Sequence, residues 1–268
     1  FYDRAENYYI LLLDEPDFAV NSLTQLMTIY QKTKEWKKAI NVSEKLLQIS
    51  PESDKTPLAH YYCEYAQAVK NDDQKAFLDA LNKALFHLPS CSRASMLLGD
   101  FHLENKQFRL AADYYEAVLS QNVDYIGEVL DKIKHCYLEL NDLSGYELFL
   151  IKANQAKQNP NVDLALTQLI DETDGKIAAQ SKLYQQLRQF PNMLTFHRFI
   201  YYQINEAEEG SGKESLILLH NMVGEQIKKS FKYRCSNCGY HSYRLSWYCP
   251  SCRHWETIKA THSIEPVS

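Results

Sequence analysis

The sequence predicts an all-α chain of stacked helical pairs that ends in a small metal-stabilised β module. Helical apolar patterns and terminal prolines recur with a period of 34 residues over most of the chain. Gly and Pro number only eight each among 268 residues, and the abundance of Leu, Ala, Gln, Lys and Glu favours helix over sheet. Near the C-terminus, two Cys-x-x-Cys pairs lie ten residues apart, which is typical of a metal site.

The first 16 residues are predicted to be the second helix of a repeat that is cut in half. Tyr8 and Leu11–Leu13 supply its apolar positions, and Pro16 is expected to end it. The chain begins at Phe1 rather than at Met, so we expect it to be a fragment of a longer protein. No apolar stretch approaches the roughly 20 residues of a membrane-spanning helix.

Residues 17–191 are predicted to form a superhelix of tetratricopeptide repeats, each of two antiparallel helices. Prolines are expected just after the second helices of three repeats: Pro51, Pro89 and Pro191. The repeats are expected to begin near Val20, Leu58, Ser92, Ile126 and Pro160. The last four starts are 34 residues apart, whereas the first gap is four residues longer.

Small residues are expected where the two helices of a repeat approach each other closely. Ala39 and Ala111 occupy this position in the first and third repeats, and Gly145 and Ala179 occupy it in the fourth and fifth. Phe77 replaces the small residue in the second repeat. These positions predict tight pairing of helices throughout the array.

A last helical pair is predicted within residues 192–230, at about Met193–Glu208 and Glu214–Lys229. Gly210-Ser211-Gly212 joins the two helices. We expect this pair to cap the array and to lead into the metal module.

Residues 231–262 are predicted to be a metal module, followed by a tail at residues 263–268. Thiolates at the two ends of a Cys-x-x-Cys turn can face one ion, and two such turns complete a closed tetrahedral site. The predicted ligands are Cys235, Cys238, Cys249 and Cys252. Gly239 lets the first turn adopt a positive φ. About 30 residues cannot bury enough surface to fold unaided, so we expect the metal to stabilise the module.

Zinc and iron both accept four thiolates in a tetrahedral arrangement, so one ion of either element fits the predicted site. Cys-x-x-Cys-Gly-Tyr with Cys-Pro-x-Cys is also typical of rubredoxin iron sites, which leaves a rubredoxin-like electron-transfer protein as an alternative. A closed site leaves no coordination position for water or substrate. His241 and His254 flank the cysteines, and we expect them either to contact the ligands without binding the metal or to lie at the surface. We predict no catalytic residues and a protein that is not an enzyme.

The other three cysteines are scattered through helical patterns: Cys63, Cys91 and Cys136. We expect them to be small buried apolar residues, and their distribution favours a reducing compartment over a disulfide framework.

Residues 228–259, most of which belong to the metal module, are locally basic, with one acid, Glu256, against seven cations. The cations are Lys228, Lys229, Lys232, Arg234, Arg244, Arg253 and Lys259. Cations among aromatic residues suit nucleic acid or anionic lipid, but they also offset the roughly two net negative charges of a divalent ion with four thiolates. The structural role is the favoured interpretation, and a zinc-ribbon nucleic-acid-binding module is kept as an alternative. The net charge of −5 implies no general attraction to nucleic acid.

Several segments carry a resemblance to a known family. They are Tyr2–Asn7, Asn205–Gly210, Met222–Gln226, Tyr233–Gly239, Trp247–Cys252 and Trp255–Lys259. Together with the helical repeats, they resemble lipopolysaccharide assembly protein B, a bacterial family with tetratricopeptide repeats and a rubredoxin-like C-terminal module. The resemblance extends over the whole chain.

The resemblance implies an adaptor with an N-terminal transmembrane anchor in the bacterial inner membrane and its bulk on the cytoplasmic side. The anchor would precede Phe1 and is absent from this sequence. Members of the family promote degradation of the lipid A deacetylase by the membrane protease FtsH and so balance lipopolysaccharide against phospholipid. The resemblance therefore implies these two proteins and other lipopolysaccharide assembly proteins as partners, and the four paired cysteines as metal ligands. The sequence does not determine whether the protein forms a homo-oligomer. We also hypothesise that the metal module packs against the helical array.

Overall fold

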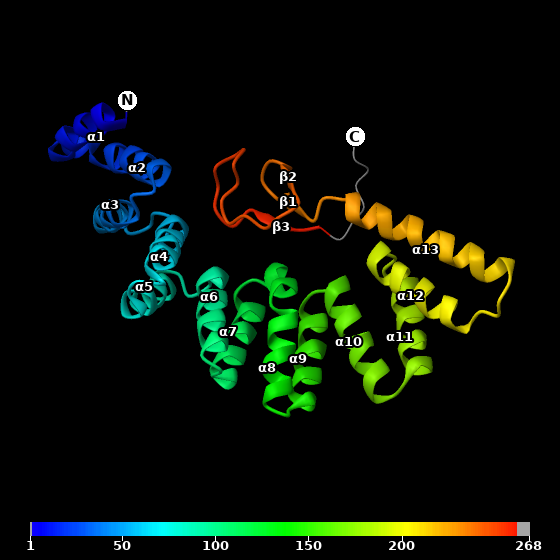
Figure 1. The fold of residues 1–268 in the computed structure, drawn as a ribbon. Helices are drawn as coiled ribbons and strands as arrows, with labels where there is room; N and C mark the ends of the chain where they lie inside the picture. The colour runs from blue at the N-terminus through cyan, green and yellow to red at the C-terminus, as the bar shows by residue number, and fades with distance from the viewer. Residues whose placement is uncertain (1, 262–268) are drawn as a thin grey trace. The chain divides into compact units, whose positions relative to one another are not determined.

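The computed structural model describes residues 2–261, so the predicted tail at residues 263–268 lies outside the described part of the chain. This part contains thirteen α-helices followed by a sheet of three short strands (Figure 1). Within each of the two units described below, successive helices pack as pairs, and the predicted fold class of tetratricopeptide-type helical pairs with a small C-terminal β module is confirmed. The chain divides into two compact units, one up to Asn105 and one from Lys106 onward.

The first unit contains six α-helices and one turn of 3-10 helix among its described residues. They are α1 (Tyr2–Leu11), η1 (Leu12–Asp14), α2 (Pro16–Thr33), α3 (Trp36–Ile49), α4 (Thr56–Val69), α5 (Gln74–His87) and α6 (Ser92–Glu104). Pro51 and Pro89 each lie two residues beyond the end of a second helix, as the sequence predicts. Phe77 is buried and its ring packs 5.5 Å from that of Phe101, so an aromatic pair fills the space expected for a small residue.

Pro16 begins a helix instead of ending one. The first helix already ends at Leu11, a 3-10 turn follows, and Pro16 is the first residue of α2. A proline is tolerated at this position because the first N–H groups of a helix have no intrahelical acceptor.

The second unit continues the pairs and adds the metal module. Its elements are α7 (Phe108–Gln121), η2 (Val123–Glu128), α8 (Leu130–Glu139), α9 (Leu143–Ala156), α10 (Pro160–Thr173), α11 (Lys176–Gln189), α12 (Met193–Glu206), α13 (Ser211–Lys229), β1 (Tyr233–Cys235), β2 (His241–Ser242) and β3 (Ile258–Ala260). Asp142, Asn159 and Asn192 cap α9, α10 and α12, because each side chain accepts a hydrogen bond from a first-turn backbone N–H.

The fourth predicted repeat begins later than expected. Ile126 lies within the 3-10 helix η2, and the first α-helix of the repeat starts at Leu130. Tyr125 and Ile126 are nonetheless buried, so η2 is a packed part of the unit. By contrast, Ser92 and Pro160 begin α6 and α10 as predicted.

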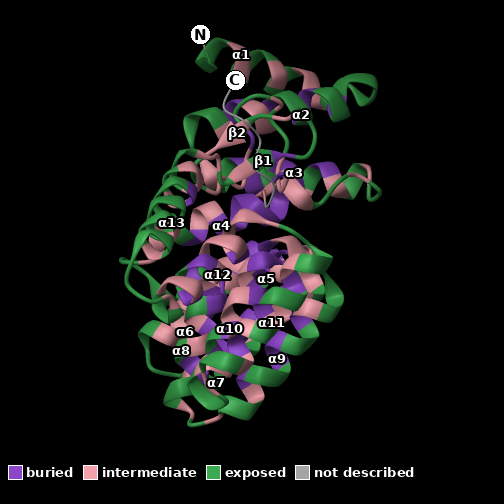
Figure 2. Cartoon of the chain, turned by 90° about the vertical axis from the view of Figure 1, so that its right-hand side faces the viewer, coloured by how far each residue is buried: buried purple, intermediate pink, exposed green. Residues whose placement is uncertain are grey.

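Close approach of paired helices explains the small residues. Ala39, Ala111 and Ala179 are fully buried. A Cβ atom built on Gly145 would lie 2.6 Å from Cε1 of Tyr137, which is closer than side chains can approach. Within each unit, buried residues lie on helix faces that meet neighbouring helices (Figure 2).

Cys63, Cys91 and Cys136 are fully buried, which confirms the prediction that they serve as small core residues. Within residues 2–261, no helix combines the length and the hydropathy that crossing a bilayer requires.

The sheet of the metal module has the strand order β2-β1-β3, and both pairings are antiparallel. Tyr233 pairs with Ser242 on one side and with Ala260 on the other, while Cys235 pairs with Ile258. Strands of two or three residues cannot form a stable sheet alone. The module therefore depends on its turns and on the surface against which it packs.

Candidate metal centre

The first cysteine turn follows directly from β1. The Gly239 N–H donates to the carbonyl of Cys235 at 2.9 Å, and the Cys235 N–H donates to the carbonyl of Tyr240 at 2.7 Å. Gly239 has φ +76°, in the left-handed region that glycine adopts without steric cost. The turn predicted from this glycine is confirmed.

The second cysteine turn has the same geometry without a glycine. The Arg253 N–H donates to the carbonyl of Cys249 at 2.9 Å, and the Cys249 N–H donates to the carbonyl of His254 at 2.9 Å. Arg253 takes the position that Gly239 holds in the first turn, with φ 62°. The sequence did not indicate this, because a left-handed arginine is uncommon.

The two turns bring four sulfur atoms together. The ligand atoms of Cys235, Cys238, Cys249 and Cys252 all lie within 4.8 Å of one another. Sγ of Cys235 lies 3.6 Å from Sγ of Cys252, and Sγ of Cys238 lies 3.7 Å from Sγ of Cys249. A tetrahedron with metal–sulfur bonds of about 2.3 Å has edges of about 3.8 Å. The donor set therefore fits one tetrahedral ion, and the spacing is far too long for disulfide bonds.

Hydrogen bonds and burial shift the pKa values of Cys235, Cys249 and Cys252 in different directions. The side chain of Asn237 and the backbone N–H of His254 lower the pKa of Cys252 to about 5. Burial opposes ionisation of Cys235, but its hydrogen bond with the Thr257 side chain and hydrogen bonds from the N–H groups of the turn outweigh burial and lower the pKa of that thiol. Burial raises the pKa of Cys249 to about 12. A site with these properties offers some ready thiolates and others that ionise only when a cation offsets their charge.

Neither flanking histidine contributes an atom to the sulfur cluster. Nδ1 of His254 lies 2.8 Å from the carbonyl of Cys252, and this exposed ring has a raised pKa because of its hydrogen bond to Cys252. The ring of His241 packs 5.2 Å from that of Phe231. Neither histidine therefore belongs to the set of four candidate ligands.

The metal module packs against η2 of the helical array, mainly through Tyr125. The ring of Tyr125 lies 4.7 Å from that of Trp247, and its hydroxyl donates to the carbonyl of Glu256 at 3.1 Å. Tyr125 is only 1% exposed, so the array and the module together enclose it. The hypothesis that the module packs on the array is confirmed for these contacts.

Two polar contacts flank this aromatic pair. The Tyr233 hydroxyl donates to Oε1 of Glu128 at 2.9 Å. Lys259 pairs with Asp124, whose second oxygen lies 2.5 Å from Nζ of Lys157. Burial opposes the charge on Asp124, yet the two lysines lower the pKa of its carboxyl group below the ordinary value. Lys259, one of the seven basic residues, therefore has a structural role.

Sequence reasoning did not find Asp124, Tyr125 and Glu128. The sequence pattern predicts the start of a repeat helix in this stretch, and no motif there indicates a segment that contacts the metal module. The only local indication is Gly127, which lowers helix propensity at that point.

Comparison with known proteins agrees with this geometry. The family described as "Rubredoxin metal binding domain" matches residues 233–260, which include both cysteine turns. Lipopolysaccharide assembly protein B of Haemophilus influenzae is 56% identical over 265 residues, covering 99% of this chain and 67% of that protein. The chain belongs to the lipopolysaccharide assembly protein B family.

A second lipopolysaccharide assembly protein B, from Escherichia coli K12, is 37% identical over 265 residues and aligns with 98% of this chain and 68% of its own length. The resemblance noted from the sequence is thereby confirmed. A solved structure of Pseudomonas aeruginosa PilF covers 80% of this chain and 92% of its own, with 18% identity and a TM-score of 0.43. A similarity at that level supports no conclusion about function.

Proposed function

We propose that this protein is a non-enzymatic adaptor in lipopolysaccharide synthesis, whose helical repeats hold a partner protein. The observation that carries the proposal is the 56% identity, over 99% of the chain, to a protein named for lipopolysaccharide assembly. Repeat arrays suit this role because stacked helical pairs provide extended binding surfaces.

We infer that Cys235, Cys238, Cys249 and Cys252 hold one zinc or iron ion. A bound ion would supply four metal–thiolate bonds that join the two cysteine turns into one unit. Gly239 and Arg253 hold the two turns in shape, and Asn237 provides a hydrogen bond to Cys252. Elemental analysis of the purified full-length protein identifies the metal. A reversible visible spectrum would indicate iron and favour the electron-transfer alternative.

The more specific role follows the family resemblance. The partner would be the lipid A deacetylase, which the protein would deliver to the membrane protease FtsH. The protein would then lie at the inner membrane with its repeats and metal module on the cytoplasmic side. In that arrangement the metal module would hold the docking segment η2 in place and so support the partner-binding surface.

The test measures the half-life of the deacetylase in cells after protein synthesis is blocked. Cells would carry the full-length protein, the Cys235→Ser/Cys238→Ser variant, the Ser251→Ala control or no copy. Ser251 lies between the two cysteines of the second turn and is exposed, so the control alters the turn without removing a thiolate. We expect a short half-life with the natural protein and with the control, and a longer one with the cysteine variant. An equal half-life in cells with and without the protein would overturn the proposal.

A further inference from the structure

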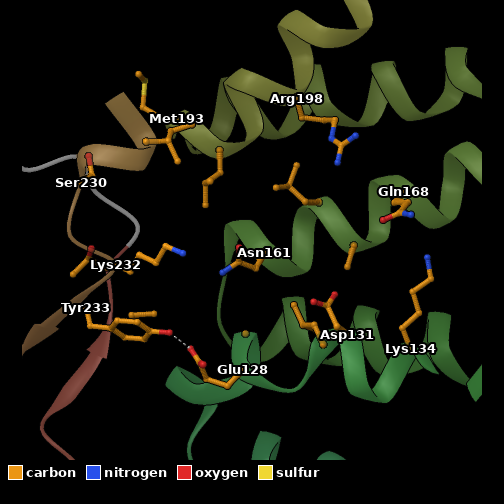
Figure 3. A pocket seen from close by; sticks show the side chains of 18 of the residues that line it. Glu128, Asp131, Lys134, Asn161, Gln168, Met193, Arg198, Ser230, Lys232 and Tyr233 are labelled. Carbon is orange, nitrogen blue, oxygen red and sulfur yellow. Dashed lines mark hydrogen bonds between the residues drawn. The ribbon is translucent and has the colours of Figure 1, made fainter. Parts of the chain in front are cut away.

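A groove of about 520 Å³ lies in the second unit between the helices and the metal module (Figure 3). Residues of α8, α10 and α12 form its sides and floor. The end of α13 and the segments around β1 and β3 close one end of it. Its volume lies within the range of about 300–1,000 Å³ that is typical of ligand sites.

The metal module supplies a wall of this groove. Phe231, Lys232 and Tyr233 line it just before the first cysteine turn, and Ala260 lines it from β3. The Tyr233 hydroxyl is bonded to Glu128 at the base of the groove, as Figure 3 shows. Any change that loosens the module therefore changes the shape of the groove.

Two cations face into the groove without a carboxylate partner. Arg198 projects from α12 and Lys232 from the metal module (Figure 3). Both residues are exposed, and neither forms an ion pair with any residue in the range 2–261. A third cation, Lys134, is already paired with Glu172 at 3.2 Å. Arg198 and Lys232 are thus available to an acidic group of a ligand.

The floor of the groove combines apolar side chains with two amides. Leu164 and Ala165 lie on α10 between Asn161 and Gln168. Nε2 of Gln168 already donates to Oε1 of Glu172 at 3.0 Å, so Asn161 is the amide that remains for a ligand. The Asn161 side chain makes no hydrogen bond within the described residues, and an amide can both donate to and accept from a peptide backbone.

We propose that this groove binds an extended segment of a partner protein in which an acidic side chain lies next to an apolar one. Lys232 binds an acidic side chain at the end of the groove that the metal module closes, and Arg198 binds a second acidic group farther along the groove (Figure 3). Leu164 and Ala165 contact the apolar side chain, and Asn161 bonds the peptide backbone. This inference rests on the proposed function, because it requires that the helical repeats hold a partner. The metal module provides Lys232, so binding depends on an intact metal centre.

A polyanion such as nucleic acid fits the groove less well than a peptide. The carboxylates of Glu128 and Asp131 also line it, so the cations are not clustered as a phosphate-binding surface requires. The apolar side chains on the floor of the groove also offer no hydrogen bonds to a phosphate backbone.

The first experiment screens the metal-loaded full chain against an array of short synthetic peptides in which acidic, basic and apolar positions vary. The tightest peptide is then labelled and titrated by fluorescence anisotropy. We expect the selected peptides to carry Asp or Glu beside an apolar residue. Arg198→Glu and Lys232→Glu should each weaken binding about tenfold or more, as expected for a lost charge-assisted hydrogen bond. Lys176→Glu on α11 makes the same charge change outside the groove and should have no effect.

Metal dependence is tested with Tyr233→Phe, which keeps all four thiols but removes the bond that fastens the module to Glu128. We expect weaker peptide binding than in the natural protein at equal metal content. Selection of basic peptides, failure of all peptides to bind, or tighter binding of anionic lipid vesicles or RNA would overturn the inference. So would unchanged affinity in both charge variants.

The proposed function can fail separately. If Arg198→Glu and Lys232→Glu still capture the deacetylase as well as the natural protein does, the groove is not the partner site and the adaptor role stands. If the natural protein binds acidic peptides yet leaves deacetylase half-life unchanged, the groove stands and the role in turnover fails.

Discussion

Replacing Tyr233 with Phe should loosen the metal module from the helical array while leaving its cysteines intact. The hydroxyl of Tyr233 donates to Glu128 at 2.9 Å, and this bond joins β1 to η2. Burial and the neighbouring carboxylate raise the pKa of Tyr233, so the hydroxyl remains a donor at neutral pH. The substitution removes one oxygen atom and preserves the ring.

The expected loss is about 1.5 kcal/mol in the free energy of unfolding of the second unit. Hydrogen bonds to charged groups contribute about 1.5–3 kcal/mol. Glu128 borders the open groove, so water can solvate its carboxylate once the partner is gone, which places the loss at the low end. For a unit of this size, the loss corresponds to a fall of about 3–6 °C in Tm.

A double-mutant cycle of Tyr233→Phe with Glu128→Gln measures the interaction energy of this hydrogen bond. The rate at which a coloured chelator captures metal from the protein reports on detachment of the metal module from the array. Tyr137→Phe serves as one control, because Tyr137 bonds Glu116 at 2.5 Å within the array and should lower Tm without accelerating metal release. Tyr243→Phe is the second, because Tyr243 is 52% exposed and its contact with the Lys229 carbonyl is long, at 3.4 Å. A coupling energy near zero between residues 233 and 128, or equal metal release from all three variants, would show that this bond does not hold the module.

Three further predictions concern single positions. Gly239→Ala should weaken metal affinity about fivefold in a competition titration. The added Cβ would meet nothing closer than 3.6 Å, so the only cost is about 1 kcal/mol for placing alanine in a left-handed backbone conformation. Arg253→Gly should cause no such loss. Gly145→Ala should destabilise the second unit by about 1–3 kcal/mol, measured by urea unfolding, because the new Cβ would clash with Tyr137. Gly212 has open space around it, so Gly212→Ala should cause no such loss. Equal effects of the two substitutions would contradict the packing argument. Asp124→Asn should lower stability at neutral pH. The pKa of Asp124 is lowered in the folded state, so its contribution to the free energy of unfolding is complete at pH values above the ordinary pKa of 3.8. That contribution is lost as the pH falls below 3.8 toward the lowered pKa, so the difference in stability between the natural protein and Asp124→Asn should shrink at low pH.

The regular part of the molecule could be predicted because its determinants are local. Pro51, Pro89 and Pro191 mark helix ends within two residues, since a proline cannot continue a helix. The four cysteines could be placed around one point because the spacing of Cys-x-x-Cys fixes the turn.

The contacts between the module and the array could not be predicted in this way. Tyr125 and Trp247 are far apart in the sequence, and each has an ordinary local environment. Pro16 was misjudged because the same residue suits the start of a helix and the point beyond its end. The groove also escaped prediction, because it forms only where helices from three repeats and the module meet.

The sequence distance between η2 and the surface that covers it has a consequence for synthesis of the chain. Tyr125 and Glu256, which bond in the folded protein, are 131 residues apart. At about 5–20 residues per second, a ribosome needs roughly 7–26 s to make the intervening chain. During that interval Tyr125 of η2 has been synthesised but is uncovered, so the nascent protein is most exposed to chaperones and to aggregation before residues 231–262 emerge and take up metal.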